Sequence, residues 1–373
     1  MKVLNFEDSV YKANAIRKIL GNRCGVASVE QVSNVEDGLK MLKDAENAGE
    51  PFNLIITDMH FPMRSGAISD TEAGEKLVQI LQAQGNQTNI IVCSSRNMKL
   101  PGVYGCIWYS EISDWEEELC DLVREMEQMI YAMSDIHGQY ELFRNLMEQI
   151  PLGKDDTLYV LGDVVDRGPD SMNTLKYMMA NPNIIPIMGN HELMALPCLK
   201  LLVSELSKDF LHKLSSQAHQ SFAEWTLNGG ISTIQEFLKL PKEERRQVVE
   251  YIESFRPYGK KIINNGEYWL IHAGLEHFSE SRRLEEYSVE ELVWKRTDFD
   301  IAYFKNITVV SGHTPTQNIL GNSRPGYIFK KNNLIAIDCG AGENNGRLAA
   351  ICLDTGEEYY LSLIHISEPT RRS

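Results

Sequence analysis

Short apolar runs that alternate with helix-like segments are the feature that most restricts the fold of this chain. Over residues 1–128, five strand-like runs (KVLNF, VASVEQV, FNLIITDM, NIIVCSS and GCIWYS) are separated by segments in which apolar residues recur at helical spacing. This alternation predicts a doubly wound sheet of parallel strands, with its functional site at the carboxyl ends of the strands. We therefore expect an α/β domain over residues 1–128.

Four polar side chains follow these runs. Glu7 and Asp8 end the first run, Asp58 the third and Ser94 the fourth, so we expect all four to converge on one edge of the sheet. This arrangement resembles the receiver domain of two-component response regulators. The resemblance implies that Asp58 accepts a phosphoryl group, that Glu7 and Asp8 hold Mg²⁺, and that Ser94 is the small hydroxyl residue of the site.

One position departs from the receiver pattern. The family normally carries a lysine after the fifth strand, where it contacts the phosphoryl group. Here that position falls near Tyr109, and no lysine occurs between Leu100 and Met133. Two interpretations follow: a receiver-like domain that a histidine kinase phosphorylates, or a domain of the same fold that is never phosphorylated and serves for docking or dimerisation.

A second domain is expected to begin at Met129, without a glycine-rich or proline-rich linker. In it, side chains that can bind metals follow apolar runs in five glycine-containing blocks: SDIHG, LGDVVDRG, MGNHE, LIHAG and SGHTPT. A mixture of Asp, His and Asn suits Mn²⁺, Fe²⁺ or Zn²⁺. A carboxylate that bridges two cations would explain why Asp163 follows a buried run, since the cations offset the cost of burying its charge.

These blocks, in this order and spacing, resemble the phosphoprotein phosphatase family of dinuclear metallophosphoesterases over about residues 129–360. The resemblance implies an α/β sandwich, with two mixed sheets flanked by helices, and two divalent metal ions. Manganese is the expected metal, with iron or zinc as alternatives. The implied ligands are Asp135 and His137 for the first ion, Asp163 as the bridge, and Asn190, His272 and His313 for the second ion.

The same resemblance assigns residues to the reaction. His191 matches the general acid, Asp166 the carboxylate that orients it, and Arg167 and Arg296 the contacts to the substrate phosphate. The family often has an arginine before its GNHE block, where this chain has Met188. Two metal ions activate a water molecule, and the resulting hydroxide attacks phosphorus in line. The general acid then protonates the leaving alkoxide.

The expected function is a metal-dependent phosphomonoesterase, acting on serine/threonine phosphoproteins or a phosphorylated small molecule, and regulated by or docked through the receiver-like domain. A first alternative is hydrolysis of a dinucleoside polyphosphate of the diadenosine tetraphosphate type. A second, from another class, is a docking protein of two-component signalling with little hydrolytic activity. A lone Asp or His at a strand end is usually a turn residue, but five blocks in order favour catalysis.

Between the third and fourth blocks, about residues 193–260 are expected to form a cap-like helical insertion over the metals. Within it, WTLNGGIST (225–233) is expected to form a helix, a turn and a second helix. Residues 361–373, LSLIHISEPTRRS, differ from the preceding pattern and are expected to be a non-native tail derived from a sequencing adapter.

Composition limits the partners and the compartment. The chain of 373 residues carries a net charge of −15, which disfavours nucleic acid as a partner. No apolar run approaches the length of a membrane span, so no membrane association is expected. Seven scattered cysteines without CxxC spacing indicate reduced thiols and a cytoplasmic location.

Overall fold

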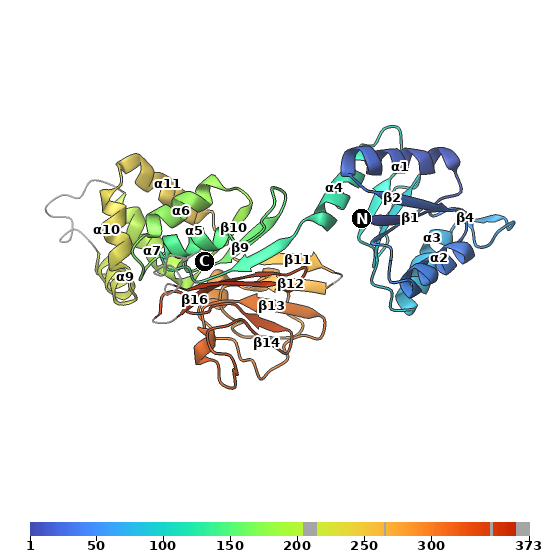
Figure 1. Cartoon of the computed structure of the whole chain (residues 1–373). Coiled ribbons are helices and arrows are strands. Elements are labelled where there is room, and N and C mark those ends of the chain that lie inside the picture. The colour runs from blue at the N-terminus through green and yellow to red at the C-terminus, as the bar shows by residue number, and fades with distance from the viewer. Residues whose placement is uncertain (204–214, 265, 344–345, 363–373) are drawn as a thin grey trace, which may run out of the picture. The chain divides into compact units, whose positions relative to one another are not determined.

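In the computed structural model (Figure 1), the described residues are 1–203, 215–264, 266–343 and 346–362. The chain divides into two compact units, Met1–Gln128 and Met129–Ser373. Of the segments discussed above, the middle of the expected insertion and all but the first two residues of the expected tail lie outside the described residues.

The first unit holds a sheet of five parallel strands in the order β2-β1-β3-β6-β7. Its strands are β1 (Lys2–Phe6), β2 (Ser28–Val32), β3 (Leu54–Thr57), β6 (Asn89–Ser94) and β7 (Gly105–Trp108). Its helices are α1 (Val10–Cys24), α2 (Val35–Asn47), α3 (Ala73–Ala83) and α4 (Trp115–Glu127). The sheet is doubly wound, as the alternation of strand-like and helix-like segments predicts.

Local signals begin and end these helices. The Ser9 side chain accepts a hydrogen bond from the Lys12 N–H at the start of α1, and Gly25 ends α1 with a φ of 68°. Apolar side chains fill both faces of the sheet, with α2 and α3 on one face and α1 and α4 on the other. The long loop after Asp58 contains a two-stranded ribbon, β4 (Phe61–Pro62) with β5 (Ser69–Asp70).

The second unit is a sandwich of two mixed five-stranded sheets, with strand orders β10-β9-β8-β16-β17 and β11-β12-β13-β15-β14. In the first sheet, β8, β9 and β10 are parallel, and in the second, β12, β13 and β15 are parallel. The first sheet comprises β8 (Ile130–Met133), β9 (Thr157–Leu161), β10 (Ile184–Ile187), β16 (Arg347–Cys352) and β17 (Glu358–Ser362). The second comprises β11 (Gly259–Ile263), β12 (Gly266–Leu270), β13 (Ile307–Ser311), β14 (Phe329–Lys331) and β15 (Leu334–Ala336).

Helices cover the outer face of the first sheet, and the second sheet packs on its inner face (Figure 1). These helices are α5 (Tyr140–Met147), α6 (Ser171–Ala180), α7 (Asn190–Leu202), α9 (Ser216–Leu227), α10 (Ile231–Lys239) and α11 (Lys242–Glu253). The short helix α12 (Val289–Val293) contributes Leu292 to the core beside the second sheet, and 3₁₀ turns lie at Leu284–Glu286 and Thr316–Asn318. The described part of the insertion is mainly helical up to Glu253, its last residues enter β11, and 225–233 form the expected helix, turn and helix. The mixed α/β fold class predicted from the sequence is confirmed.

Strand direction places the edge of the second unit at which the candidate ligands lie. Apolar residues of both sheets, including Ile130, Leu161, Leu270 and Val310, interdigitate in the middle of the sandwich. Because the parallel strands of each sheet run in one direction, their carboxyl ends meet at a common edge.

The strand β17 continues to Ser362 and pairs with β16, so the first two residues of the expected tail belong to the sheet. No helix among the described residues is long and apolar enough to cross a membrane.

Candidate active site

All six expected metal ligands follow parallel strands of the second unit. Asp135 and His137 follow β8, Asp163 follows β9, Asn190 begins α7 after β10, His272 follows β12 and His313 follows β13. Four of these residues have backbone φ angles that L-residues rarely adopt: Asp135 (52°), His137 (48°), Asp163 (54°) and His313 (63°). The turns after these strands are therefore strained, which is common where a backbone is shaped for function.

Four atoms of the expected second metal site converge. Nε2 of His272 lies 2.9 Å from Oδ1 of Asn190, 3.3 Å from Nδ1 of His313 and 3.4 Å from Oδ1 of Asp163. Nδ1 of His313 lies 3.0 Å from the same Asn190 oxygen. The Leu161 carbonyl can only accept a hydrogen bond, so at 2.7 Å it fixes the proton of His272 on Nδ1. The unprotonated Nε2 of His272 therefore faces three electron-pair donors.

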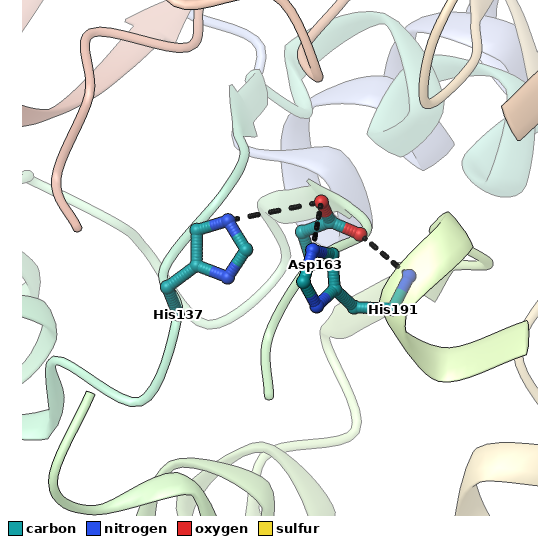
Figure 2. A group of neighbouring side chains, drawn as sticks. All are labelled: His137, Asp163 and His191. Atoms are coloured by element: carbon teal, nitrogen blue, oxygen red, sulfur yellow. Dashed lines mark hydrogen bonds and ion pairs between the residues drawn. The ribbon is translucent and has the colours of Figure 1, made fainter. Parts of the chain in front are cut away.

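The other oxygen of Asp163 faces the expected first site (Figure 2). Its Oδ2 lies 3.7 Å from Nε2 of His137, which in turn lies 4.0 Å from Oδ1 of Asp135. The His137 Nδ1–H donates to the Val165 carbonyl at 3.1 Å, so its Nε2 also carries a lone pair. Asp163 thus lies between the two groups, as a bridging carboxylate would.

The chemistry of these donors fits divalent cations. Burial lowers the pKa of His137 to about 3 and the pKa of His313 to about 4, so both imidazoles are neutral and can bind a metal. Burial, together with the charges of Asp338 and Asp163, raises the pKa of Asp135 well above its usual range. Buried carboxylates and unprotonated nitrogens that face one another would repel without positive charge between them.

A histidine–carboxylate pair flanks this cluster. Nδ1–H of His191 donates to Oδ2 of Asp166 at 2.7 Å, and both side chains are buried. Burial lowers the pKa of His191, but the charges of Asp163 and Asp166 outweigh burial and raise it above its ordinary value. Figure 2 shows the His191 ring directed toward Asp163, with Nε2 3.9 Å from Oδ2 of Asp163. Nη2 of the exposed Arg167 lies 3.2 Å from the same Nε2.

Two further positions bear on phosphate binding, the expected contact Arg296 and Met188, which stands where the family often has an arginine. Arg296 is exposed, and its charge helps to lower the pKa of His313, after burial and His272. Met188 is buried, and its N–H donates to the Arg256 carbonyl at 2.8 Å. A methionine at this place fills the interior and offers no cation to a phosphate.

Sequence reasoning missed two buried acids in this region. Asp338, which follows β15, accepts a hydrogen bond from the Gly340 N–H at 2.8 Å. Its segment, LIAIDCG, has the same pattern of an apolar run, an acid and a glycine as the recognised blocks, so that pattern could have identified it. Glu192 accepts four backbone N–H groups, those of Asp163 (2.8 Å), Val164 (2.8 Å), Val165 (3.2 Å) and Gly189 (3.1 Å).

At the carboxyl edge of the first unit, a lysine from α1 joins two of the expected acids. Nζ of Lys12 lies 2.8 Å from Oε2 of Glu7 and 3.1 Å from Oδ1 of Asp58, and donates to the Cys93 carbonyl at 2.7 Å. The same Nζ lies 5.2 Å from the ring centroid of Tyr109. Lys12 is buried, and sequence reasoning missed it because it lies on the first helix and not after the fifth strand.

The remaining two expected residues of this edge make other contacts. Asp8 is exposed and accepts a hydrogen bond from the Ser69 hydroxyl at 3.2 Å. Ser94, at the end of β6, is buried, and its hydroxyl accepts the Arg96 N–H at 3.3 Å. The structure therefore brings Glu7 and Asp58 together through Lys12, while Asp8 follows β1 and Ser94 ends β6, the strands on either side of β3.

Residues 129–340, more than half of the chain, match calcineurin-like phosphoesterases. The chain belongs to the calcineurin-like phosphoesterase family. It is 30% identical to a symmetrical bis(5'-nucleosyl)-tetraphosphatase of Nitrosospira multiformis over 149 residues, 39% of this chain and 43% of that protein. It is 27% identical to serine/threonine-protein phosphatase 2 of Escherichia coli K12 over 224 residues, 59% of this chain and 90% of that protein.

Among solved structures, a putative diadenosine tetraphosphatase matches with a TM-score of 0.42 and 19% identity, over 63% of this chain and 93% of that chain. The chain spans less than half the length of the first curated relatives that it matches. The relatives belong to two substrate classes, because one is named a dinucleoside tetraphosphatase and the other a serine/threonine-protein phosphatase.

Proposed function

We propose that this chain is a metal-dependent phosphomonoesterase. One observation carries the proposal: neutral imidazole nitrogens and carboxylate oxygens converge around Asp163, beside the hydrogen-bonded His191–Asp166 pair. A purely structural cluster would pair donors with acceptors, whereas this cluster sets acceptors against acceptors. Such a cluster is expected where cations are held.

Two groups of residues would hold two divalent ions, with Asp163 shared between them. Asp135 and His137 complete the first group, and Asn190, His272 and His313 complete the second group. When bound, the ions supply a hydroxide near neutral pH and offset negative charge on the transferred phosphoryl group. We propose Mn²⁺ as the metal, with Fe²⁺ or Zn²⁺ as alternatives, because the donor set mixes nitrogen and oxygen.

The protein's own residues position the substrate and its leaving group. The guanidinium groups of Arg167 and Arg296 bind the phosphate oxygens and offset the charge that develops on them. Nε2 of His191 is directed into the cluster and protonates the leaving oxygen, while Asp166 holds Nδ1 and keeps the ring oriented. Protonation matters because an alkoxide is a poor leaving group.

Release of phosphate from p-nitrophenyl phosphate, with and without added Mn²⁺, tests this proposal. We expect activity that depends on the metal and is lost in Asp163→Asn. His219→Ala, which changes an exposed histidine of α9, is the control and is expected to keep wild-type activity. Full activity after Asp163→Asn, or activity that persists after exhaustive chelation, would refute the assignment.

Serine/threonine phosphoproteins are the substrates that we propose. The support is the Escherichia coli protein phosphatase, 90% of which is covered by the similarity. A second candidate is a dinucleoside polyphosphate, favoured by the identity of 30% to a tetraphosphatase and by a pocket of about 190 Å³. This pocket is lined by Leu193, Met194, Pro197, Ser221, Glu224 and Trp294. The indole of Trp294 is half-exposed and offers a flat face on which a nucleotide base can stack.

Kinetic comparison separates these two substrates. We expect kcat/KM for phosphoserine and phosphothreonine peptides to exceed kcat/KM for diadenosine tetraphosphate. The opposite order, together with a loss of dinucleotide hydrolysis in Trp294→Ala, would favour the second candidate. Hydrolysis of neither substrate by a protein that binds metal would favour a docking protein of two-component signalling.

For the first unit, we propose a receiver module in which Asp58 accepts a phosphoryl group, with Mg²⁺ held by Glu7 and Asp8 and Ser94 as the hydroxyl contact. The geometry of Lys12 supports this proposal. Its ammonium lies 3.1 Å from Oδ1 of Asp58, where it can pair with an added phosphoryl group. Lysine is thus present at this edge although the position near Tyr109 lacks it.

Incubation with acetyl phosphate and Mg²⁺, followed by intact-mass measurement, tests the receiver proposal. We expect one added phosphoryl group in the wild type and none in Asp58→Asn. If acetyl phosphate modifies a response regulator used as a positive control but adds no phosphoryl group to the wild type, the first unit would instead be a docking or dimerisation module. Phosphate release measured before and after incorporation then reports whether this module regulates the second unit.

We also propose the boundaries and location that the sequence indicates: a receiver-like domain over 1–128, a catalytic domain over 129–360 and a cytoplasmic protein. The free state of all seven cysteines supports a reducing compartment. The adapter origin of 361–373 is tested by mass spectrometry of the protein made from its native locus. A C-terminal peptide ending in SEPTRRS would refute it.

A further inference from the structure

One buried carboxylate receives hydrogen bonds from three separate helices. Oδ2 of Asp166 accepts the His191 Nδ1–H at 2.7 Å and the Trp225 Nε1–H at 2.8 Å, and Oδ1 accepts the Thr233 hydroxyl at 2.7 Å. All four side chains are almost completely inaccessible to solvent. His191 lies on α7, whereas Trp225 on α9 and Thr233 on α10 belong to the insertion.

The insertion also holds the backbone that carries this carboxylate. Oγ1 of Thr233 accepts the Asp166 N–H at 2.9 Å, and the Gly229 carbonyl accepts the Arg167 N–H at 3.1 Å. Asp166 and Arg167 have φ angles of 73° and 63°, which are unfavourable for residues with side chains. The turn between α9 and α10 therefore stabilises a strained backbone at the point where it presents a carboxylate and a guanidinium.

Two glycines allow this close approach. A Cβ on Gly229 would lie 2.9 Å from Cγ of Arg167, and Gly229 has a φ of 103°. A Cβ on Gly230 would lie 2.6 Å from Nε1 of Trp225. The turn of the insertion is thus shaped to let the indole and the backbone reach Asp166 and Arg167.

We propose that Trp225 and Thr233 are positioning residues for proton donation by His191. A carboxylate with only the imidazole as a partner can rotate about its Cβ–Cγ bond, and the imidazole can follow it. The indole and the hydroxyl fix both carboxylate oxygens, so Nε2 of His191 stays directed at the leaving oxygen. This inference rests on the proposed function, in which Nε2–H gives its proton to that oxygen as the phosphorus–oxygen bond breaks and leaves a neutral imidazole.

The inference predicts a dependence on the leaving group. The serine oxygen of a phosphoserine ester leaves as an alkoxide and needs the proton, whereas the p-nitrophenolate of p-nitrophenyl phosphate leaves without it. We expect Trp225→Phe and Thr233→Val each to lower kcat for a phosphoserine peptide by about tenfold, below the loss caused by removing a general acid altogether. For p-nitrophenyl phosphate, we expect a reduction of less than about twofold.

Matched controls separate positioning from packing. Trp269→Phe removes a buried indole N–H that donates to the Glu267 carboxylate at 2.7 Å, and Thr174→Val removes a buried hydroxyl that donates to the Asp170 carbonyl at 2.9 Å. We expect both control variants to retain wild-type ratios of the two rates. Thr233→Ser, which keeps the hydroxyl, is expected to restore the peptide rate that Thr233→Val loses.

A second measurement does not depend on turnover. In the full chain loaded with Zn²⁺, the Nδ1–H proton of His191 is expected to resonate far downfield in the NMR spectrum because it is hydrogen-bonded to a carboxylate. In Trp225→Phe and Thr233→Val it is expected to move upfield and to exchange faster with water. An unchanged resonance, or equal losses for both substrates, would overturn the inference. A wild type that hydrolyses neither substrate would instead refute the proposed function.

Discussion

Glu192 holds the turn that carries Asp163, so its substitution should lower both the stability of the fold and the affinity of the candidate metal site. Its carboxylate accepts four backbone N–H groups, among them that of Asp163. In Glu192→Gln, the side-chain carbonyl can accept two of these N–H groups, while the amide nitrogen faces the other two. The lost hydrogen bonds to a charged acceptor are worth about 1.5–3 kcal/mol each, so we expect the free energy of unfolding to fall by about 3–6 kcal/mol.

Three measurements check this expectation in the full chain. Urea unfolding followed by tryptophan fluorescence gives the loss of stability of the second unit. Hydrogen–deuterium exchange of the peptide over residues 162–166 should become faster, since its amides lose their acceptor. Titration calorimetry should show Mn²⁺ binding weakened by about tenfold or more, as is usual when a group that orients metal ligands is removed.

Glu236→Gln is the matched control. This half-buried carboxylate accepts the Ser171 and Met172 N–H groups at 3.1 and 2.9 Å, one on each oxygen. We expect a loss of about one such hydrogen bond, about 1.5–3 kcal/mol, without any change in metal affinity. Wild-type stability, exchange and Mn²⁺ affinity in Glu192→Gln would show that its four hydrogen bonds do not maintain the site.

Other regions of the chain yield three further predictions. In Gly312→Ala, a Cβ would lie 2.2 Å from Oδ2 of Asp135, so calorimetry should show Mn²⁺ binding weakened about tenfold. The control Gly21→Ala places its Cβ in open space on α1 and should bind Mn²⁺ with wild-type affinity. Equal Mn²⁺ affinities of the two variants would contradict the steric argument. Lys12→Met leaves Glu7 and Asp58 without their shared cation, so urea unfolding of the first unit should show a loss of about 3–5 kcal/mol, and an unchanged midpoint would contradict a stabilising ion pair. Hydrogen bonds from the Arg282 side chain and the Ser288 N–H lower the pKa of Glu291 to about 2, so its charged form adds stability above its unfolded pKa of about 4.5, and this stability is lost as the pH falls toward 2. Thermal unfolding should therefore show Glu291→Gln melting below the wild type near pH 7 and with it near pH 2, and a difference independent of pH would contradict the linkage.

The fold could be predicted where local pattern and burial agree. The five runs of the first unit form five parallel strands, and the apolar runs before the candidate ligands all form parallel strands of the sandwich. Strand order could not be predicted, because it depends on how distant segments pack. The ribbon of β4 and β5 was missed for a different reason, since its two short strands carry no apolar alternation.

Parts of the candidate site could likewise be predicted, because an acid or histidine beside glycine after a buried run is a local signal. Asp338 carries this signal and was overlooked. Trp225, Thr233 and Lys12 carry none: each lies on a helix and contacts a carboxylate more than 40 positions away in sequence, although Lys12 also pairs with the nearby Glu7. Only tertiary packing places such side chains.

The strained turns of the second unit have a consequence for attempts to engineer this protein. Asp135, His137, Asp163, Asp166, Arg167 and His313 have φ angles between 48° and 73°, each costing about 1 kcal/mol relative to a relaxed backbone. Glycine adopts these angles freely. At the exposed Arg167 and at His137 and His313, selection for heat resistance alone should therefore enrich glycine and yield more heat-stable proteins that lack side chains of the candidate site.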